Sequence, residues 1–186
     1  MHMKKYLSVT IFFLIFITLP ALVFSAENPP EPGDILPDFT FEAPLNEEEQ
    51  RYLGIEDKDS FRLEELEADF FLIEVVGMYC PICHLQSEEV NRLFEKITAD
   101  EHLAKKMLMF SIASGSPDRE IDYLKNTWQA PYPILPDYDF DFFNTIGNPG
   151  VPFTLIVSRD REIHYTNTGR MPDLSEYIER IREIVR

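Results

Sequence analysis

Two cysteines separated by two residues, Cys80-Pro81-Ile82-Cys83, are the residues whose type and spacing most clearly predict chemistry. They are the only cysteines in the chain, and they stand where an apolar run of strand length gives way to a helical pattern. Thiols at this spacing in the first turn of a helix can close a small disulfide. The N-terminus of the helix favours the thiolate of Cys80, because unpaired backbone N–H groups and the helix dipole stabilise an anion. Cys83, one turn deeper, is then the resolving thiol. A purely structural disulfide is the alternative, but so short a loop would stabilise little.

A second candidate is Glu74, a carboxylate within the apolar run F-F-L-I-E-V-V and six residues before Cys80. A buried acid is costly unless it has a partner or a task. Six residues along a strand and a turn can place this carboxyl beneath the cysteine pair. There, desolvation would raise its pKa, and it could accept the proton of Cys83 directly or through a water molecule. The alternative is an exposed glutamate at a sheet edge, without a role.

The third candidate is the dipeptide Val151-Pro152, which stands directly before the strand pattern of residues 153–157. A proline at this place fits a cis peptide bond in a tight turn. Proline has no N–H, so it would leave an uncovered backbone edge near the cysteines, where the backbone of Val151 could pair with an extended substrate segment. The sequence fits an ordinary trans loop proline equally well.

The periodicity of the chain predicts the elements that must position these residues. Central strands are expected from the apolar runs, and amphipathic helices from apolar residues that recur every three to five positions. In the helix that follows the cysteines these are Leu85, Val90, Leu93, Phe94 and Ile97. Strands are expected at about 38–41, 61–63, 70–76, 107–112, 153–157 and 163–168, and helices at 81–98, 118–128, 139–146 and from Pro172-Asp173 onward. The acidic residues 47–49 are expected in a solvated loop. This alternation predicts an α/β fold in which helices flank a central mixed β-sheet on both faces.

The N-terminus has the layout of a targeting segment. Lys4 and Lys5 precede an apolar run over residues 9–19, and small residues follow near position 25. This predicts a signal peptide or an N-terminal membrane anchor over residues 1–26, a Pro-rich linker over 27–37 and one domain over 38–186. With either form of the segment, the domain is exported to the periplasm or the outer face of the cytoplasmic membrane, where disulfides persist.

The composition excludes several classes of function. The 186 residues include 17 Lys and Arg against 33 Asp and Glu, a net charge of −16. Such a surface repels nucleic acid and anionic lipid headgroups, so the only membrane contact expected is through the N-terminal segment. Hydrophobic residues make up 45% of the chain, which excludes a wholly disordered protein.

Three segments resemble the thioredoxin-like superfamily. L-I-E-V-V-G-M-Y-C-P-I-C is similar to its active-site strand and turn, and G-V-P-F-T-L-I-V to its cis-proline segment. P-G-D-I-L-P-D-F resembles the start of the redoxin branch, which includes TlpA-like thiol:disulfide reductases and peroxiredoxins. The resemblance implies a thioredoxin fold with a Cys80–Cys83 disulfide, Glu74 as proton acceptor, and a substrate groove at Tyr79, Pro81, Val151 and Pro152. Tyr79 replaces the usual Trp and Phe153 the commoner Thr, which can alter the choice of partner.

The function expected is that of an exported thiol:disulfide oxidoreductase that needs no metal ion or organic cofactor. Cys80 attacks a partner disulfide, and Cys83 resolves the mixed disulfide. The resemblance to TlpA-like proteins favours a reductase of protein disulfides. Apocytochrome c is then a candidate partner, and a membrane thiol electron donor would recharge the protein. A thiol oxidase or isomerase remains open, because the Cys-Pro-Ile-Cys motif is compatible with either direction.

Other classes are also compatible with parts of the sequence. Cys80 to His84 fits the C-x-x-C-H pattern of c-type haem attachment, although His84 is then expected on the surface of a helix. A peroxiredoxin would have Thr where Gly77 stands, and a copper carrier would group His84, His102 and His164 near the cysteines. A redox-inert binding module on the same fold is a further alternative, which the intact cysteine pair and its acid disfavour.

Overall fold

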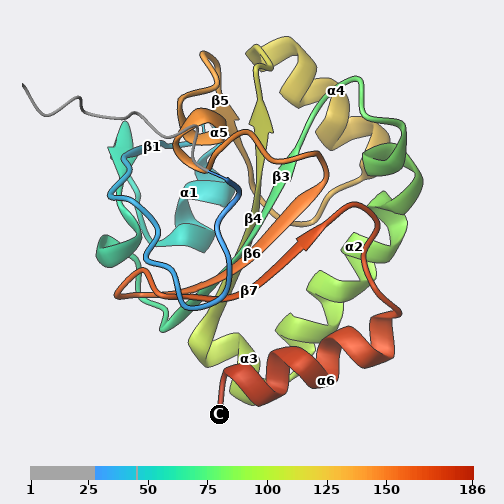
Figure 1. Ribbon diagram of the computed structural model, residues 1–186. Coiled ribbons are helices and arrows are strands. Elements are labelled where there is room, and N and C mark those ends of the chain that lie inside the picture. Colours follow the sequence, from blue (N-terminus) through green and yellow to red (C-terminus); the bar gives the residue numbers. More distant parts are fainter. Residues whose placement is uncertain (1–27, 45) are drawn as a thin grey trace, which may run out of the picture.

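The central feature of the computed structural model, which describes residues 28–44 and 46–186, is a five-stranded mixed sheet (Figure 1). The strand order is β5-β4-β3-β6-β7. Strands β3, β4 and β5 run parallel, whereas β6 is antiparallel to β3, and β7 to β6. The bounds are β3 Phe70–Val76, β4 Met107–Ser114, β5 Ile134–Asp137, β6 Phe153–Ser158 and β7 Ile163–Thr168, and a separate small sheet pairs β1 Phe41–Glu42 with β2 Ser60–Phe61.

Helices cover the two faces of this sheet, as the sequence predicts, and two hydrophobic clusters lie between them (Figure 1). Alternate residues of β3 supply one cluster each, because side chains of a strand point to opposite faces in turn. On one face pack α2 Pro81–Ala99, α3 Glu101–Lys106, α4 Asp118–Trp128 and α6 Leu174–Ile184; on the other pack α1 Glu47–Leu53, α5 Asp141–Thr145 and the 3-10 turn Leu63–Glu65.

Helix α2 begins directly after Cys80, which caps it, and contains Cys83 in its first turn. The Cys80 side chain is its N-cap, and Pro81 occupies the first turn, where a missing N–H costs nothing. The buried side of α2 runs through Cys83, Gln86, Val90, Leu93, Phe94 and Ile97. The expectation for Leu85 was wrong: it is 79% exposed, and Gln86 lies on the buried face in its place. Spacings of three and four from Cys83 and Val90 select position 86 rather than 85.

The acidic residues expected in a solvated loop instead form helix α1. The Asn46 side chain caps this helix by accepting from the N–H groups of Glu48 and Glu49. Three glutamates in the first turn also oppose the positive end of the helix dipole. Helix α3 and edge strand β5 were likewise not expected; β5 contains Pro136, which argues against a strand except at an edge.

Part of the predicted linker belongs to the folded domain. The backbone of residues 33–36 pairs with residues 161–163, through bonds that include Leu36 N–H to the Arg161 carbonyl at 2.8 Å. Leu36 is 1% exposed. The predicted signal peptide or anchor over residues 1–26 lies outside the described residues. Within the part of the chain that the structure describes, no helix is both long and apolar enough to span a membrane.

Candidate active site

The two cysteines form a disulfide where β3 ends and α2 begins. The Cys80–Cys83 bond has an S–S distance of 2.26 Å and a Cα–Cα distance of 5.3 Å. Cys80 is 8% exposed and Cys83 2%. The backbone N–H of Cys83 points at the Cys80 sulfur from 3.1 Å, as expected for a residue at the N-cap. This N–H would stabilise a thiolate at Cys80 once the disulfide is reduced.

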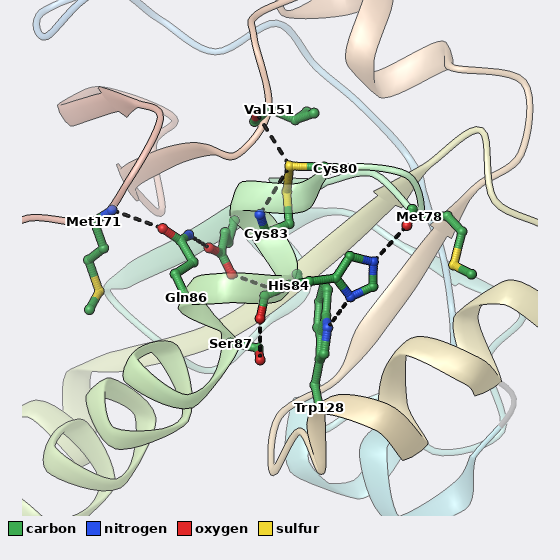
Figure 2. Close-up of a disulfide and its surroundings, with 11 residues drawn as sticks. Met78, Cys80, Cys83, His84, Gln86, Ser87, Trp128, Val151 and Met171 are labelled. Carbon is green, nitrogen blue, oxygen red and sulfur yellow. Dashed lines mark hydrogen bonds between the residues drawn. A yellow bond between two sulfur atoms is a disulfide. The ribbon is translucent and has the colours of Figure 1, made fainter.

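The Val151-Pro152 segment lies beside Cys80, the more exposed of the two cysteines. The Val151 carbonyl oxygen is 3.6 Å from the Cys80 sulfur, and the Val151–Pro152 peptide bond is cis. Figure 2 shows the two residues facing each other. Val151 is half-buried, whereas Pro152 is buried. The structure therefore brings together two sequence-predicted segments that are about 70 positions apart in the chain.

Glu74 lies in the middle of the central strand, on the face that packs against α2. Its neighbours across the sheet are Ser111 on β4 and Thr154 on β6, so it does not stand at a sheet edge. It is 4% exposed. Burial raises the pKa of its carboxyl, and hydrogen bonds from Gln86 and Ser111 lower it. Burial is the larger effect, and the resulting pKa is about 7. Such a group can exchange a proton near neutral pH.

Gln86 completes the surroundings of this carboxyl, and sequence reasoning missed it. Its amide nitrogen donates to Glu74 Oε1 at 2.6 Å, and its amide oxygen accepts from the Met171 N–H at 2.9 Å. The bond to Met171, drawn in Figure 2, fixes the orientation of the amide. Its N–H₂ group therefore faces the Glu74 carboxyl. A polar residue at a buried position of α2 was the only available signal in the sequence.

His84 is not the helix-surface residue that the sequence predicted. Its ring is half-buried between the Met78 carbonyl, 2.8 Å from Nε2, and the Trp128 indole N–H, 2.9 Å from Nδ1. Both ring nitrogens are thus occupied by protein groups, and the neighbouring cysteines are joined to each other. This geometry does not fit covalent haem attachment with His84 as a ligand. Among residues 28–44 and 46–186, no cluster of three or more His, Cys, Asp or Glu side chains could hold a metal ion.

The remaining predicted site residues are divided between surface and core. Tyr79 is 83% exposed beside the disulfide, and its hydroxyl donates to Glu120 at 3.1 Å. Pro81 is exposed in the first turn of α2. Phe153 is buried in the opposite hydrophobic cluster and does not face the cysteines. Tyr79, Pro81 and Ile82 therefore contribute accessible surface next to Cys80, and Val151 is partly exposed beside it.

The sequence was compared with protein families and with known proteins. No family model matches the chain. The thiol-disulfide oxidoreductase ResA of Halalkalibacterium halodurans is 20% identical over 128 residues, which are 69% of this chain and 69% of that protein.

Solved structures show the same fold. A putative thiol:disulfide interchange protein DsbE from Chlorobium tepidum has a TM-score of 0.62 at 14% identity, over 84% of this chain and 99% of its own. A putative protein disulfide isomerase from Bacteroides thetaiotaomicron has a TM-score of 0.65 at 14% identity, over 83% and 90%. StoA from Bacillus subtilis has a TM-score of 0.58 at 9% identity, over 79% and 98%.

The chain is thus a thioredoxin-fold protein with its cysteine pair at the start of a helix. The predicted fold class is confirmed. The predicted resemblance to the redoxin, TlpA-like thiol:disulfide reductases is confirmed as well, through the similarity to ResA and DsbE proteins.

Proposed function

We propose that this protein is a thiol:disulfide oxidoreductase that exchanges disulfides with partner proteins through Cys80 and Cys83. The unequal exposure of the two cysteines is the observation that carries this proposal. Cys80 stands at the N-cap of α2 with 8% of the residue exposed, whereas Cys83, one turn deeper, is 2% exposed. We therefore expect Cys80 to meet the partner first and Cys83 to react with Cys80 afterwards.

The reaction follows from this arrangement. In the reduced protein, the Cys80 thiolate attacks a sulfur of the partner disulfide, forms a mixed disulfide and releases one partner thiolate. Cys83 then gives its proton to Glu74, directly or through water, and attacks the Cys80 sulfur. The mixed disulfide breaks, the second partner thiolate leaves, and the Cys80–Cys83 bond forms. Two electrons have passed from the protein to its partner.

The carboxyl of Glu74 suits this proton transfer. Its pKa of about 7 lies near neutral pH, and its face of β3 is the one that packs against α2. The substrate contacts that we propose are Tyr79, Pro81 and the segment Val151-Pro152. The Val151 carbonyl, close to the Cys80 sulfur, can accept a backbone N–H from an extended partner segment.

For the direction of exchange we propose reduction in an exported location. The resemblance of the active-site segments to TlpA-like reductases supports this direction, and the names of the relatives, a thiol-disulfide oxidoreductase and a thiol:disulfide interchange protein, support disulfide exchange itself. The predicted targeting segment supports a domain outside the cytoplasm. Protein disulfides, including those of apocytochrome c, are the proposed substrates, and a membrane thiol protein is the proposed electron donor.

The midpoint potential of the Cys80/Cys83 couple tests the direction. A value near or below about −250 mV supports a reductase, and a value above about −150 mV makes the protein an oxidant of exported thiols. In parallel, Cys83→Ser should accumulate mixed disulfides through Cys80, whereas the matched variant Cys80→Ser should not. Absence of any two-electron thiol couple in the folded protein contradicts the proposed activity itself.

A further inference from the structure

His84 connects the turn before the cysteines to a helix on the same face of the sheet. The imidazole lies between the Met78 carbonyl, two residues before Cys80, and the indole of Trp128 at the end of α4 (Figure 2). The two rings meet edge to face, with centroids 5.4 Å apart and an interplanar angle of 76°. The proposed exchange reaction assigns no role to this pair.

The hydrogen bonds define which ring nitrogen carries the proton. An indole N–H can only donate, so Nδ1 of His84 must accept from Trp128 and is unprotonated. In the neutral ring the proton then lies on Nε2, which donates to the Met78 carbonyl at 2.8 Å. Trp128 thus selects the one neutral form of His84 that can bind this turn.

Trp128 is itself held in place by α2. The Asn91 side-chain amide donates to the Trp128 carbonyl at 2.8 Å, two turns along α2 from His84. The indole is also buried, with 5% of the residue exposed. Because Trp128 is fixed by its backbone and by packing, its indole N–H offers His84 an immobile donor.

We propose that His84 is a positioning residue for the redox couple, which holds the turn Gly77–Cys80 in the conformation that closes the disulfide. This inference rests on the proposed function and adds a determinant of its redox potential. One backbone bond closes the same turn, from Cys80 N–H to the Gly77 carbonyl at 3.1 Å. The imidazole adds a second bond, which reaches the Met78 carbonyl from the helix side.

The sign of the effect follows from the entropy of ring closure. A turn held by His84 keeps Cys80 near Cys83, so little conformational freedom is lost when the disulfide forms. Without the imidazole the reduced turn samples more conformations, and closing the disulfide costs more. Removal of His84 should therefore favour the dithiol and make the protein a stronger oxidant.

The test is the equilibrium of the full-length protein with glutathione, followed in three variants. His84→Phe, which keeps a ring but has no donor, should shift the equilibrium about tenfold toward the dithiol, or about 30 mV for a two-electron couple. His84→Gln keeps an amide donor for Met78 and should recover most of this shift. His102→Gln is the matched control, since His102 also binds a carbonyl, that of Val185, but far from the cysteines.

Each result bears on the proposal. An unchanged or opposite shift in folded His84→Phe overturns it, and so does a shift of equal size in His102→Gln. Failure of the proposed function looks different, because the wild-type protein would then show no exchange with glutathione at all.

A spectroscopic signal provides a second, independent test. Trp128 is the only tryptophan in the chain, so the tryptophan emission comes from the indole that is bonded to His84. We expect the emission to change on reduction of the wild-type disulfide and to lose this redox response in His84→Phe. A redox response that persists in the variant contradicts the proposed link between the imidazole and the couple.

Discussion

The amide of Gln86 donates a 2.6 Å hydrogen bond to Glu74, and this bond joins the helix that carries the cysteines to the central strand of the sheet. Ser111 on β4 donates to the other carboxylate oxygen at 3.3 Å. A buried acid with two donors is stabilised in its charged form, whereas desolvation favours the neutral form. The balance of these two effects brings the pKa of the Glu74 carboxyl to about 7, so that this group can both accept and return a proton near neutral pH.

The first prediction concerns stability against pH. The Glu74 carboxyl holds its proton up to about pH 7 in the folded protein, but only up to about 4.5 when unfolded. Between these values the folded state binds more protons, so stability falls as pH rises, by about 3 kcal/mol at most. Denaturant unfolding of the oxidised protein from pH 4 to 8 should show this decline, and Glu74→Gln should remove it. The exposed Glu88→Gln serves as control, and an identical decline in Glu74→Gln would assign the titration to another group.

The second prediction concerns Gln86. Gln86→Leu removes the donor to Glu74, and a hydrogen bond to a charged group is worth about 1.5–3 kcal/mol. The pKa of Glu74 should therefore rise by about one to two units, visible as an extension of the same stability decline to higher pH. Gln50→Leu is the matched control, because Gln50 donates only to the Pro44 carbonyl. If the stability of Gln86→Leu stops falling at the same pH as that of the wild type, the Gln86 amide does not control the pKa of Glu74.

The third prediction separates partner binding from redox chemistry. Tyr79 is 83% exposed next to the disulfide, and its hydrogen bond to Glu120 is at the surface. Tyr79→Ala should lower kcat/KM for a protein disulfide about tenfold, while the rate with glutathione disulfide and the midpoint potential stay within twofold and about 10 mV of wild type. Tyr123→Ala, an exposed tyrosine on α4, is the control. If the rates with the protein disulfide and with glutathione disulfide fall equally, Tyr79 acts in the exchange reaction itself rather than in partner recognition.

The fourth prediction concerns packing at the end of β4. Gly115 has a φ of +66°, and a Cβ at this position would lie 2.0 Å from the Phe140 ring. Gly54 has a φ of +70° but open space around it. Gly54→Ala should therefore cost only the left-handed backbone strain, about 1–2 kcal/mol, whereas Gly115→Ala adds a clash of about 1–3 kcal/mol. Equal losses in unfolding free energy would mean that Phe140 moves away freely.

Much of this architecture could be predicted because it depends on local patterns. The apolar run at β3 and the spacing of apolar residues in α2 follow from periodicity, and the position of Cys80 follows from the boundary between the two elements. Helix α1 could have been recognised from Asn46 as a cap before three glutamates, had their charge not been attributed to a loop. Strand β5 was not predicted because it contains Pro136, which argues against a strand. The proline is tolerated there because β5 is at the edge of the sheet.

The contacts within the site could not be predicted, because they join residues far apart in the chain. Gln86 meets Met171 across 85 positions, and His84 meets Trp128 across 44. Each of these polar side chains fits a surface position by its type alone. Only the packing of α2 against α4 and the loop after β7 makes Gln86 buried and His84 half-buried, and gives both side chains their hydrogen-bond partners.

These attachments of α2 also limit how the molecule can respond when its disulfide opens. The helix is bonded to α4 through Asn91 and to the loop after β7 through Gln86, and both partners are independent of the sulfurs. We therefore expect reduction to change mainly the cysteine side chains and the turn before them, and the oxidised and reduced forms to present nearly the same outline. A partner would then distinguish the two forms by their sulfur chemistry rather than by the shape of the domain.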